Sequence, residues 1–284
     1  MHKERRRTVR VKRTGLYRHS LDTLDRPSIK FAETRDELEQ AFKLVHDVYV
    51  EKKFIQRTEN GLYYNIYSLL PNTAHIIAKS YLSVVSNLTS IFDDPLLGLP
   101  MDEIYHDEVN DLRKSGKKVM EVSALATPRE KRWQQIFMYL MQVWYWYSLY
   151  MGIDVACIAV NPRHVRFYRN LLSFEQFGEQ KHYDRVDAPA VALKVDLKSI
   201  EEKMLNIYKD LDFDTNLYEY FYRMTGVKPS KKSKGNLHIN YKDVEISVQH
   251  LQLSDLKYFL AKNPQIYSSI SEEQMHYLEG CYQE

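Results

Sequence analysis

The segment 119–127, VMEVSALAT, places one carboxylate, Glu121, among the apolar and small residues that are typical of a strand. A carboxylate inside a sheet is costly to bury unless it faces a cleft or has a partner. Partial loss of its water raises its pKa towards neutrality, where the group can take a proton from a substrate. We therefore predict that Glu121 is a general base. The alternative is a structural carboxylate that pairs with an arginine or a lysine.

The elements around Glu121 form a run of strand, helix, strand and helix. Large apolar or aromatic residues occupy every face of 136–151 at helical spacing, which predicts a buried helix. The segment 153–160 lacks polar alternation and is expected to be a strand covered on both faces, as in a parallel pair. The segment 161–172 opens with Asn161, a favourable N-cap, and should be a helix. Such a unit brings the ends of its two strands to one edge of the sheet, where sites form.

The flanking segments extend this sheet. A short strand is expected at 28–31, followed by a helix that Thr34 caps, with Glu37 in the reciprocal position of a capping box. The segment 72–92 predicts an antiparallel pair of strands, and 97–116 predicts a loop followed by a polar helix. The remaining expected elements are two antiparallel strands within 174–184 and 189–197, and helical pieces near 200–209 and 215–224.

The length of 284 residues suits one large domain with an appendage. We expect a basic flexible tail at 1–27, a main domain at 28–198 and an appendage of unknown role at 199–284. The appendage contains an alternating stretch, 237–251, that predicts a hairpin. The 22 tyrosines are unusually many, and they either line clefts or lie buried with satisfied hydroxyls.

Composition disfavours several classes of protein. Cys157 and Cys281 do not make a disulfide framework and fit a reducing compartment, so we expect a cytoplasmic protein. We see no zinc pattern and expect no metal, and the N-terminus lacks the apolar run of a signal peptide. Polar residues interrupt the apolar stretch 136–160, which argues against a transmembrane segment.

The cationic N-terminal tail has two interpretations. It is a solvated extension, or it makes contact with an anionic membrane surface or another acidic partner. No aromatic interleaving or recognition helix accompanies the tail, so we expect no nucleic-acid partner.

The residues of the central run carry a resemblance. The strand with Glu121, the long helix, the strand at 153–160 and the segment NPRHVRFYRNLLSFE (161–175) resemble the core of the GNAT acyltransferase superfamily. Within it, the chain looks like the N-acyl amino acid synthases, relatives of the acyl-homoserine lactone autoinducer synthases. The likeness spans 29–197 and includes a Leu-Pro-Met segment ahead of the strand. It implies an α/β fold of GNAT type, a central mixed twisted sheet flanked by helices, with a small α+β C-terminal appendage.

The resemblance also implies a reaction, the transfer of a fatty acyl group from a thioester to an amine. Glu121 matches the glutamate proposed as base in autoinducer synthases, although the arginine three residues later is Ala124 here. A bulge or splay of the strand would free a backbone N–H, that of Leu125 or Ala126, to bind the oxyanion. Tyr168 matches a tyrosine that many GNAT enzymes place near the thiolate as a general acid, and its alternative role is in the core.

The resemblance assigns the remaining substrate contacts. The segment 45–64 would close over the amine, with His46 and Ser123 as amine-binding candidates, although His46 also fits a satisfied helix histidine. Side chains of the apolar helix are first of all core and are candidates for the acyl-chain pocket: Phe137, Leu140 and Trp144.

The segment PREKRWQQ, 128–135, bears on the acyl donor. Coenzyme A users of this fold share a glycine-rich turn at this point, and no glycine is present here. Arg129, Lys131 and Arg132 suit the phosphate of a phosphopantetheine arm and an acidic carrier protein, with Asn161 as a further candidate contact. We therefore expect no bound cofactor, and acyl-phosphopantetheine on acyl carrier protein as the donor.

These observations predict an N-acyltransferase that moves a long fatty acyl chain from acyl carrier protein to the amine of an amino acid. Tyrosine as acceptor and the long chain come from the resemblance alone. A coenzyme A-dependent N-acyltransferase is one alternative. A catalytically silent GNAT-like module that binds a lipid or a protein is another.

Overall fold

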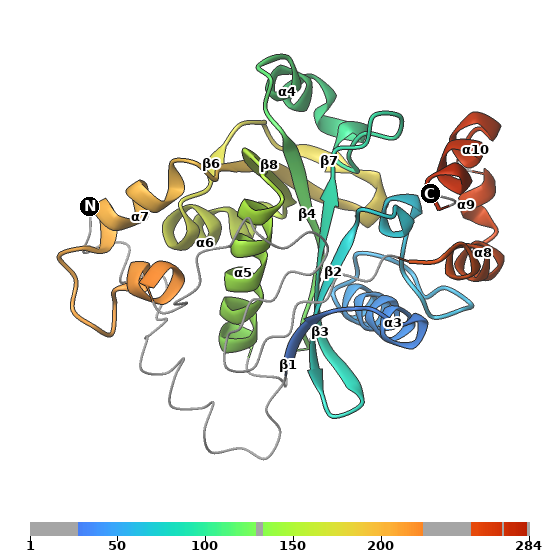
Figure 1. Ribbon diagram of the computed structural model, residues 1–284, viewed down its shortest axis with the longest axis horizontal. Coiled ribbons are helices and arrows are strands. Elements are labelled where there is room, and N and C mark those ends of the chain that lie inside the picture. The colour runs from blue at the N-terminus through green and yellow to red at the C-terminus, as the bar shows by residue number, and fades with distance from the viewer. Residues whose placement is uncertain (1–27, 129–132, 224–250, 269, 283–284) are drawn as a thin grey trace.

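The computed structural model describes residues 28–128, 133–223, 251–268 and 270–282 (Figure 1). Its strands are β1 (Ser28–Phe31), β2 (Ala74–Ser80), β3 (Ser83–Phe92), β4 (Val119–Ala126), β5 (Val155–Val160), β6 (Glu175–Gln176), β7 (Lys181–Tyr183) and β8 (Ala188–Asp196). They form one mixed sheet in the order β1, β2, β3, β4, β5, β8 and β6, with β7 paired to β8. Only the pair β4–β5 is parallel within this sheet. The strands expected within 28–31, 72–92, 119–127 and 153–160 are confirmed. The strand expected within 174–184 is instead two short strands, β6 and β7, which both pair with β8.

Helices cover both faces of the sheet (Figure 1). The helices are α3 (Arg35–Glu51), α4 (Asp102–Lys114), α5 (Trp133–Tyr150), α6 (Pro162–Leu172) and α7 (Ile200–Tyr208), with a π-helical turn, η3 (Glu219–Arg223). One face packs on α5, α6, α7 and η3, and the other packs on α3 and α4. Successive side chains of β4 point to opposite faces of the sheet. Met120 therefore joins the α5 core, while Glu121 faces α3 and α4.

The parallel pair has the connection that the sequence predicts. The buried helix α5 joins β4 to β5, and Asn161 begins α6 by accepting the N–H of Arg163 at 3.3 Å. The pairing of β4 with β5 runs from Val119 to Glu121 and then stops. Beyond Glu121, β4 is no longer paired with β5 and pairs only with β3.

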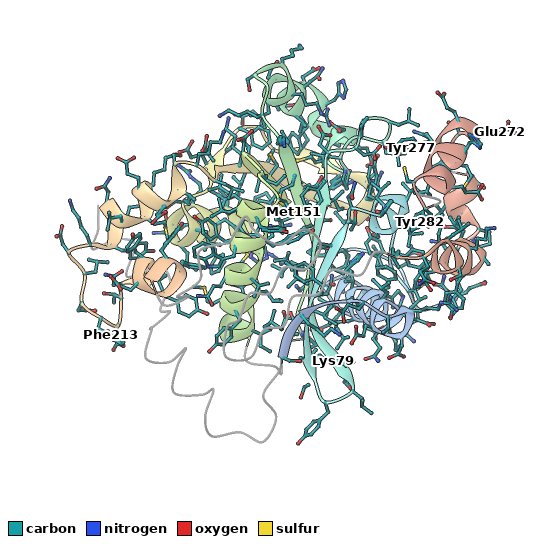
Figure 2. The ribbon with its side chains drawn as sticks, in the orientation of Figure 1. Lys79, Met151, Phe213, Glu272, Tyr277 and Tyr282 are labelled. Atoms are coloured by element: carbon teal, nitrogen blue, oxygen red, sulfur yellow. The ribbon has the colours of Figure 1, made fainter. Side chains whose placement is uncertain are left out.

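The start of α3 differs from the expected capping box. Thr34 accepts the N–H of Glu37 at 3.2 Å, as predicted. The carboxylate of Glu37 accepts the N–H of Glu33 rather than that of Thr34. It also lies 3.2 Å from the Lys30 ammonium and 2.7 Å from that of Lys79, which Figure 2 labels near the end of β2. These two cations hold the carboxylate away from the reciprocal position.

The described C-terminal residues form α8 (Leu253–Lys262), α9 (Gln265–Ser268) and α10 (Glu272–Gly280). They lie beside α3 and share a hydrophobic core with it and with η1 (Ile66–Leu69) (Figure 1). Phe259 packs on Phe42 and Tyr64 with ring centroids 5.1 and 5.4 Å apart. The Tyr64 hydroxyl donates to the carbonyl of Phe259 at 2.7 Å.

Two tyrosines near the C-terminus add polar links to the body of the protein (Figure 2). The Tyr277 hydroxyl donates to Asp94 at 3.0 Å, and the Tyr282 hydroxyl donates to the carbonyl of Leu69. In contrast, α7 and η3 pack against α5 on the opposite face. The two described parts of the C-terminal third therefore complete two different cores.

Some expectations fall on residues that the structure does not describe. The basic tail at 1–27 lies outside the described residues, as does the hairpin expected within 237–251 except for its last residue. Within the described ranges, no helix combines the length and the hydropathy that a bilayer-spanning segment requires.

The shared core predicts that α8 contributes to the stability of the whole protein. Phe259 is fully buried, so Phe259→Ala should lower the free energy of unfolding by about 3–5 kcal/mol. The matched control is Leu82→Ala, because Leu82 is 82% exposed at the β2–β3 turn and its loss should cost less than about 0.5 kcal/mol. Urea denaturation measures both. A small effect at Phe259 would show that α8 is a peripheral element.

Candidate active site

Glu121 is buried on the face of the sheet that α3 and α4 cover. Its side chain is 3% exposed, and one carboxylate oxygen accepts the backbone N–H of Met101 at 2.8 Å. Burial raises the pKa of Glu121 to about 8, while the Met101 N–H and the Arg185 charge oppose that rise. Among the described residues, no lysine or arginine forms an ion pair with Glu121. This arrangement favours a proton-transfer group over a structural ion pair.

A rigid turn holds the Met101 N–H in place. Asp102 accepts the N–H of Leu99 at 2.7 Å, and Arg113 joins Asp102 to Asp93 with contacts of 2.5 and 2.6 Å. The Leu-Pro-Met segment noticed in the sequence is this turn, placed at the start of α4. Because the N-terminal end of a helix favours negative charge, the turn supplies the Glu121 carboxylate with partial compensation for its burial.

A β-bulge follows Glu121 on β4. Thr89 pairs with Ser123 and Asn87 pairs with Ala126, so two residues of β4 stand opposite the single residue Leu88 of β3. Ala124 adopts a left-handed conformation with φ of 46°, which is strained for a residue with a side chain. The predicted irregularity of this strand is therefore present, at Ala124 and Leu125.

Asn87 holds the bulge in a defined orientation. Its side-chain amide donates to the carbonyl of Ala124 at 2.8 Å and to the hydroxyl of Thr89 at 3.1 Å. The peptide between Ala124 and Leu125 is trans and planar, so its N–H points away from its carbonyl. The Leu125 N–H consequently points away from Asn87.

A chain of buried hydrogen bonds decides which way the Asn87 amide faces. Nε2 of His75 lies 2.9 Å from the carbonyl of Ser68, which can only accept, so Nε2 carries a proton. Burial lowers the pKa of His75 to about 4, so the imidazole is neutral and its Nδ1 carries no proton. Nδ1 therefore accepts a hydrogen bond from the Thr89 hydroxyl at 3.1 Å. The Thr89 oxygen then accepts from Asn87, which presents its two N–H groups to Thr89 and Ala124.

Tyrosines from separate elements surround Glu121. Tyr49 on α3 lies against Tyr63 with ring centroids 5.1 Å apart. Burial raises the pKa of Tyr49, and Tyr63, Tyr168 and Glu121 are close enough to add to the rise. Tyr183 donates to the carbonyl of Pro100 at 3.0 Å, next to the residue that binds Glu121. Tyr49 is thus near enough to both Glu121 and Tyr168 for their charges to act on it. Glu121, Tyr49, Tyr63, Tyr168 and Tyr183 are called the Glu121 group below.

Most residues of this group have no signal in the sequence that marks them as site residues. Tyr49 lies near the end of α3, is half-buried, and has no neighbouring motif that marks it as a site residue. Tyr63 and Tyr183 stand among 22 tyrosines with nothing in their spacing to distinguish them. Asn87 lies within a strand whose polar residues have no periodic signal. The only available signal was the abundance of tyrosine itself.

The two residues predicted to bind the amine have different surroundings. Ser123 lies two residues after Glu121 on the same face of β4, half-buried and opposite Thr89. His46 is buried, but its Nε2 accepts the N–H of Thr58 at 3.2 Å and its Nδ1 lies 2.9 Å from Asp47. These partners occupy both ring nitrogens of His46, which borders a separate cavity of about 470 Å³ between α3 and residues 57–61.

The predicted acyl-pocket residues are all buried on α5. Phe137 lies 6.3 Å from the Tyr168 ring, and Tyr168 lies 5.7 Å from Phe174. Phe174 stacks on Trp144 at 6.5 Å, and Trp144 lines an apolar cavity of about 30 Å³ with Met204 and Phe221 among its walls. Leu140 is fully buried in the same core. Aromatic rings therefore connect the Glu121 group to the interior behind α5.

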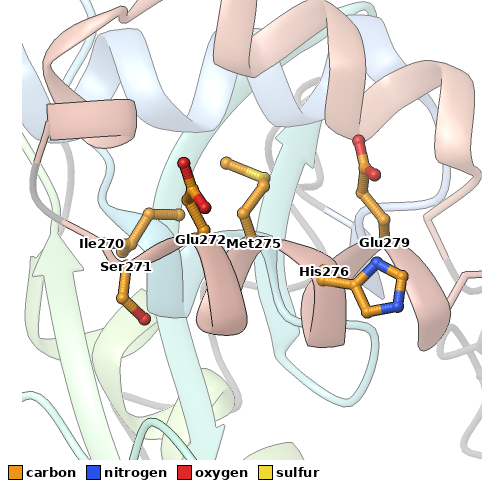
Figure 3. Close-up of a pocket in the computed structure, with 6 residues that line it drawn as sticks. All are labelled: Ile270, Ser271, Glu272, Met275, His276 and Glu279. Carbon is orange, nitrogen blue, oxygen red and sulfur yellow. The ribbon is translucent and has the colours of Figure 1, made fainter.

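The remaining candidates lie elsewhere. Asn161 serves as the N-cap of α6, and the predicted donor contacts Arg129, Lys131 and Arg132 lie outside the described residues. No group of His, Cys, Asp and Glu that could hold a metal occurs in the described part of the chain. Figure 3 shows a pocket of about 300 Å³ along α10, and none of the predicted site residues lines it. It is lined by Ile270, Ser271, Glu272, Met275, His276 and Glu279.

Comparisons with known proteins identify the family of the chain. The sequence model of one family, described as N-acyl amino acid synthase FeeM, matches residues 40–196. The chain is similar to the solved structure of FeeM, an N-acyl amino acid synthase from uncultured soil microbes. That match has 26% identity and a TM-score of 0.56, and covers 64% of this chain and 95% of FeeM.

Two further solved structures are similar to the chain. The AHL synthase LasI has 15% identity and a TM-score of 0.49 over 72% of this chain and 100% of LasI. The CoA-dependent acyl-homoserine lactone synthase BjaI has 18% identity and a TM-score of 0.46 over 62% of this chain and 89% of BjaI. A comparison with curated proteins gave no match. The GNAT-type fold expected from the sequence is confirmed by the likeness to FeeM.

The raised pKa of Glu121 predicts an unusual dependence of stability on pH. Between pH 4.5 and pH 8 the folded protein keeps a proton on Glu121 that the unfolded chain has lost. The folded state therefore binds more protons, and the free energy of unfolding should fall as pH rises through this interval. Glu121→Gln should remove that fall, as measured by urea denaturation at a series of pH values.

Glu37 provides a control, because its pKa is shifted in the opposite direction. Its two lysine partners and the Glu33 N–H lower its pKa to about 2 against the opposing effect of burial, so its contribution is present above pH 4.5 and is lost as pH falls towards 2. Glu37→Gln should therefore destabilise the protein at neutral pH and lose its effect in acid. Equal pH profiles for Glu121→Gln and the wild type would contradict the raised pKa of Glu121.

Proposed function

Because the chain belongs to the N-acyl amino acid synthase family of FeeM and is an acyltransferase, we propose the following reaction. The enzyme transfers a long fatty acyl group from the phosphopantetheine thioester of acyl carrier protein to the α-amine of an amino acid, with tyrosine as a candidate acceptor. The observation that carries the proposal is Glu121, a buried carboxylate with a pKa of about 8 that adjoins a bulged strand and a group of tyrosines.

The chemistry needs one proton acceptor and one oxyanion site. Glu121 takes a proton from the substrate ammonium, and its raised pKa brings it close to that of the amine it must deprotonate. The free amine attacks the thioester carbonyl, a C–N bond forms, and the negative oxygen accepts the Leu125 N–H at the bulge. The C–S bond then breaks, and Tyr168 gives its proton to the leaving thiolate. The nitrogen of the new C–N bond loses its surplus proton to the Tyr168 phenolate, which completes the amide and restores the phenol. Burial raises the pKa of Tyr168, which keeps it protonated for this step.

The donor and the acyl chain enter from the side of α5. The absence of glycine in 128–135 favours a carrier-bound phosphopantetheine over coenzyme A, with Arg129, Lys131 and Arg132 as contacts to carrier and phosphate. Asn161 is a further candidate contact at the start of α6. The acyl chain would follow the aromatic rings that lead from Tyr168 towards the cavity behind α5, which is lined by Trp144. Phe137 and Leu140 would border this path.

Products in cells test the proposal directly. Organic extracts from cells that express the wild-type chain should contain new N-acyl amino acids by mass spectrometry, and Glu121→Gln should reduce them by about 10²-fold or more, the range that a general base contributes. The matched control is Glu202→Gln, an exposed glutamate of α7 that should leave product unchanged. Assays of the purified protein with the same acyl group on carrier protein and on coenzyme A then compare the two donors.

Each outcome has a distinct meaning. Product that persists in Glu121→Gln would leave the acyltransferase in place and remove Glu121 as the base. Absence of product from the wild type with every amino acid and both donors would favour a silent binding module.

The bulge predicts a positioning role for Asn87. Asn87→Ala releases the Ala124 carbonyl, so the Leu125 N–H loses its fixed direction. We expect kcat to fall about tenfold to hundredfold, with the KM for the amine retained, because loss of a whole oxyanion donor costs about 10²–10³ in kcat. Ser90→Ala is the matched control on the same strand, because within the described residues the buried Ser90 hydroxyl has no hydrogen-bond partner. Equal losses of kcat in the two variants would indicate a packing effect.

A further inference from the structure

Arg185 is a cation at the edge of the Glu121 group to which the proposed reaction assigns no role. It lies on η2 (Asp184–Val186), the turn between β7 and β8, and its side chain is 30% exposed. Its Nε donates to the carboxylate of Glu103, and its guanidinium stands 5.3 Å from the centre of the Tyr67 ring. In the described part of the chain, Glu103 is the one carboxylate that forms an ion pair with Arg185.

The segment Pro100 to Glu103 joins Arg185 and Glu121 to one support. Met101 donates its N–H to Glu121, and Glu103 binds Arg185. The carbonyl of Pro100 accepts the hydroxyl of Tyr183, two residues before Arg185. Contacts with Pro100, Met101 and Glu103 therefore attach both Glu121 and the segment of Arg185 to one short turn.

Electrostatic effects agree with that placement. The Arg185 charge lowers the pKa of Glu121 and that of Tyr63, against the larger effect of burial on both groups. Arg185 is therefore near enough to act electrostatically on both Glu121 and Tyr63. A substrate bound beside these residues would meet a proton acceptor and a positive charge that are attached to the same turn.

We propose that Arg185 binds the α-carboxylate of the acceptor amino acid, with Glu103 holding the guanidinium in place through Nε. The inference rests on the proposed function. Because the ion pair with Glu103 is made at Nε, the two terminal nitrogens of the guanidinium would be left to bind a second carboxylate through two parallel hydrogen bonds. An amino acid carries its amine and carboxylate on one carbon. Arg185 would thus direct the ammonium to Glu121 and select acceptors with a free carboxylate over simple amines.

Paired acceptors test this role. Purified full-length wild type and Arg185→Met are assayed with the acyl donor that supports turnover. Each amino acid is compared with the amine that lacks its carboxylate, such as tyrosine with tyramine, phenylalanine with phenethylamine and leucine with isoamylamine. We expect Arg185→Met to raise the KM for the amino acid about tenfold to hundredfold, the range for a hydrogen bond to a charged group. The kcat/KM for the matching amine should stay the same.

Two variants and the amines separate this role from a general loss of structure. Arg185→Lys should retain part of the preference for amino acids, because it keeps the charge and loses the paired nitrogens. Arg166→Met, at an exposed arginine of α6, should change neither acceptor. An unchanged reaction with amines shows that Arg185→Met is folded and that its base and donor site work.

Three results would overturn the inference. An equal loss of kcat/KM with amino acids and with amines would show that Arg185 acts through packing. An unchanged KM for the amino acid would place its carboxylate elsewhere. If the wild type acylates amines but no amino acid, the role of Arg185 is also excluded, although the protein is still an acyltransferase. If the wild type acylates neither, the proposed function itself is overturned.

Discussion

The hydrogen bond from the Met101 N–H to the Glu121 carboxylate is the interaction on which the rest of the site depends. A carboxylate buried to this degree needs compensation, and the start of α4 supplies it through one N–H and the polarity of the helix end. The compensation is incomplete, since the pKa of Glu121 still lies near 8. The turn therefore stabilises the buried carboxyl group without returning its pKa to the usual range of a glutamate.

Strand β4 carries both Glu121 and the bulge, and its pairing changes along its length. Its first half is held by both neighbouring strands, and Glu121 is the last residue paired with β5. Its second half has a bulge whose direction is determined by Asn87, Thr89 and His75 through hydrogen bonds that end at Ser68. The buried polar residues of β2 and β3 thus act on the peptide at Leu125 rather than merely filling the core. Part of their cost of burial is offset by the hydrogen bonds that they make to one another, although the Asn87 Oδ1 has no hydrogen-bond partner within the described residues.

The C-terminal helices pack beneath an element that carries a residue of the site. The matched family region ends at residue 196, yet Phe259 and its neighbours complete the core beneath α3. Helix α3 carries Tyr49, the residue that lies near both Glu121 and Tyr168. The position of a site tyrosine therefore depends on packing by residues far along the chain. On the other face, Met204 and Phe221 close the apolar cavity next to Trp144, so the described parts of the C-terminal third border both sides of the proposed reaction path.

The sequence by itself determined the order of the elements, the parallel strand pair, the Asn161 cap and the isolation of Glu121 among apolar residues, because these follow from local periodicity and from the chemistry of neighbouring residues. Its resemblance to acyltransferases identified the family that the comparisons show. Only the tertiary structure decided that Glu37 leaves its reciprocal capping position for two lysines, that His46 has both nitrogens occupied, and that Asn87 and Arg185 stand beside the site. It also set the direction of the Leu125 N–H, because the direction of a peptide N–H depends on what binds the preceding carbonyl. Periodicity states which face of an element a residue occupies, whereas the residue opposite it comes from another element and from the register between them.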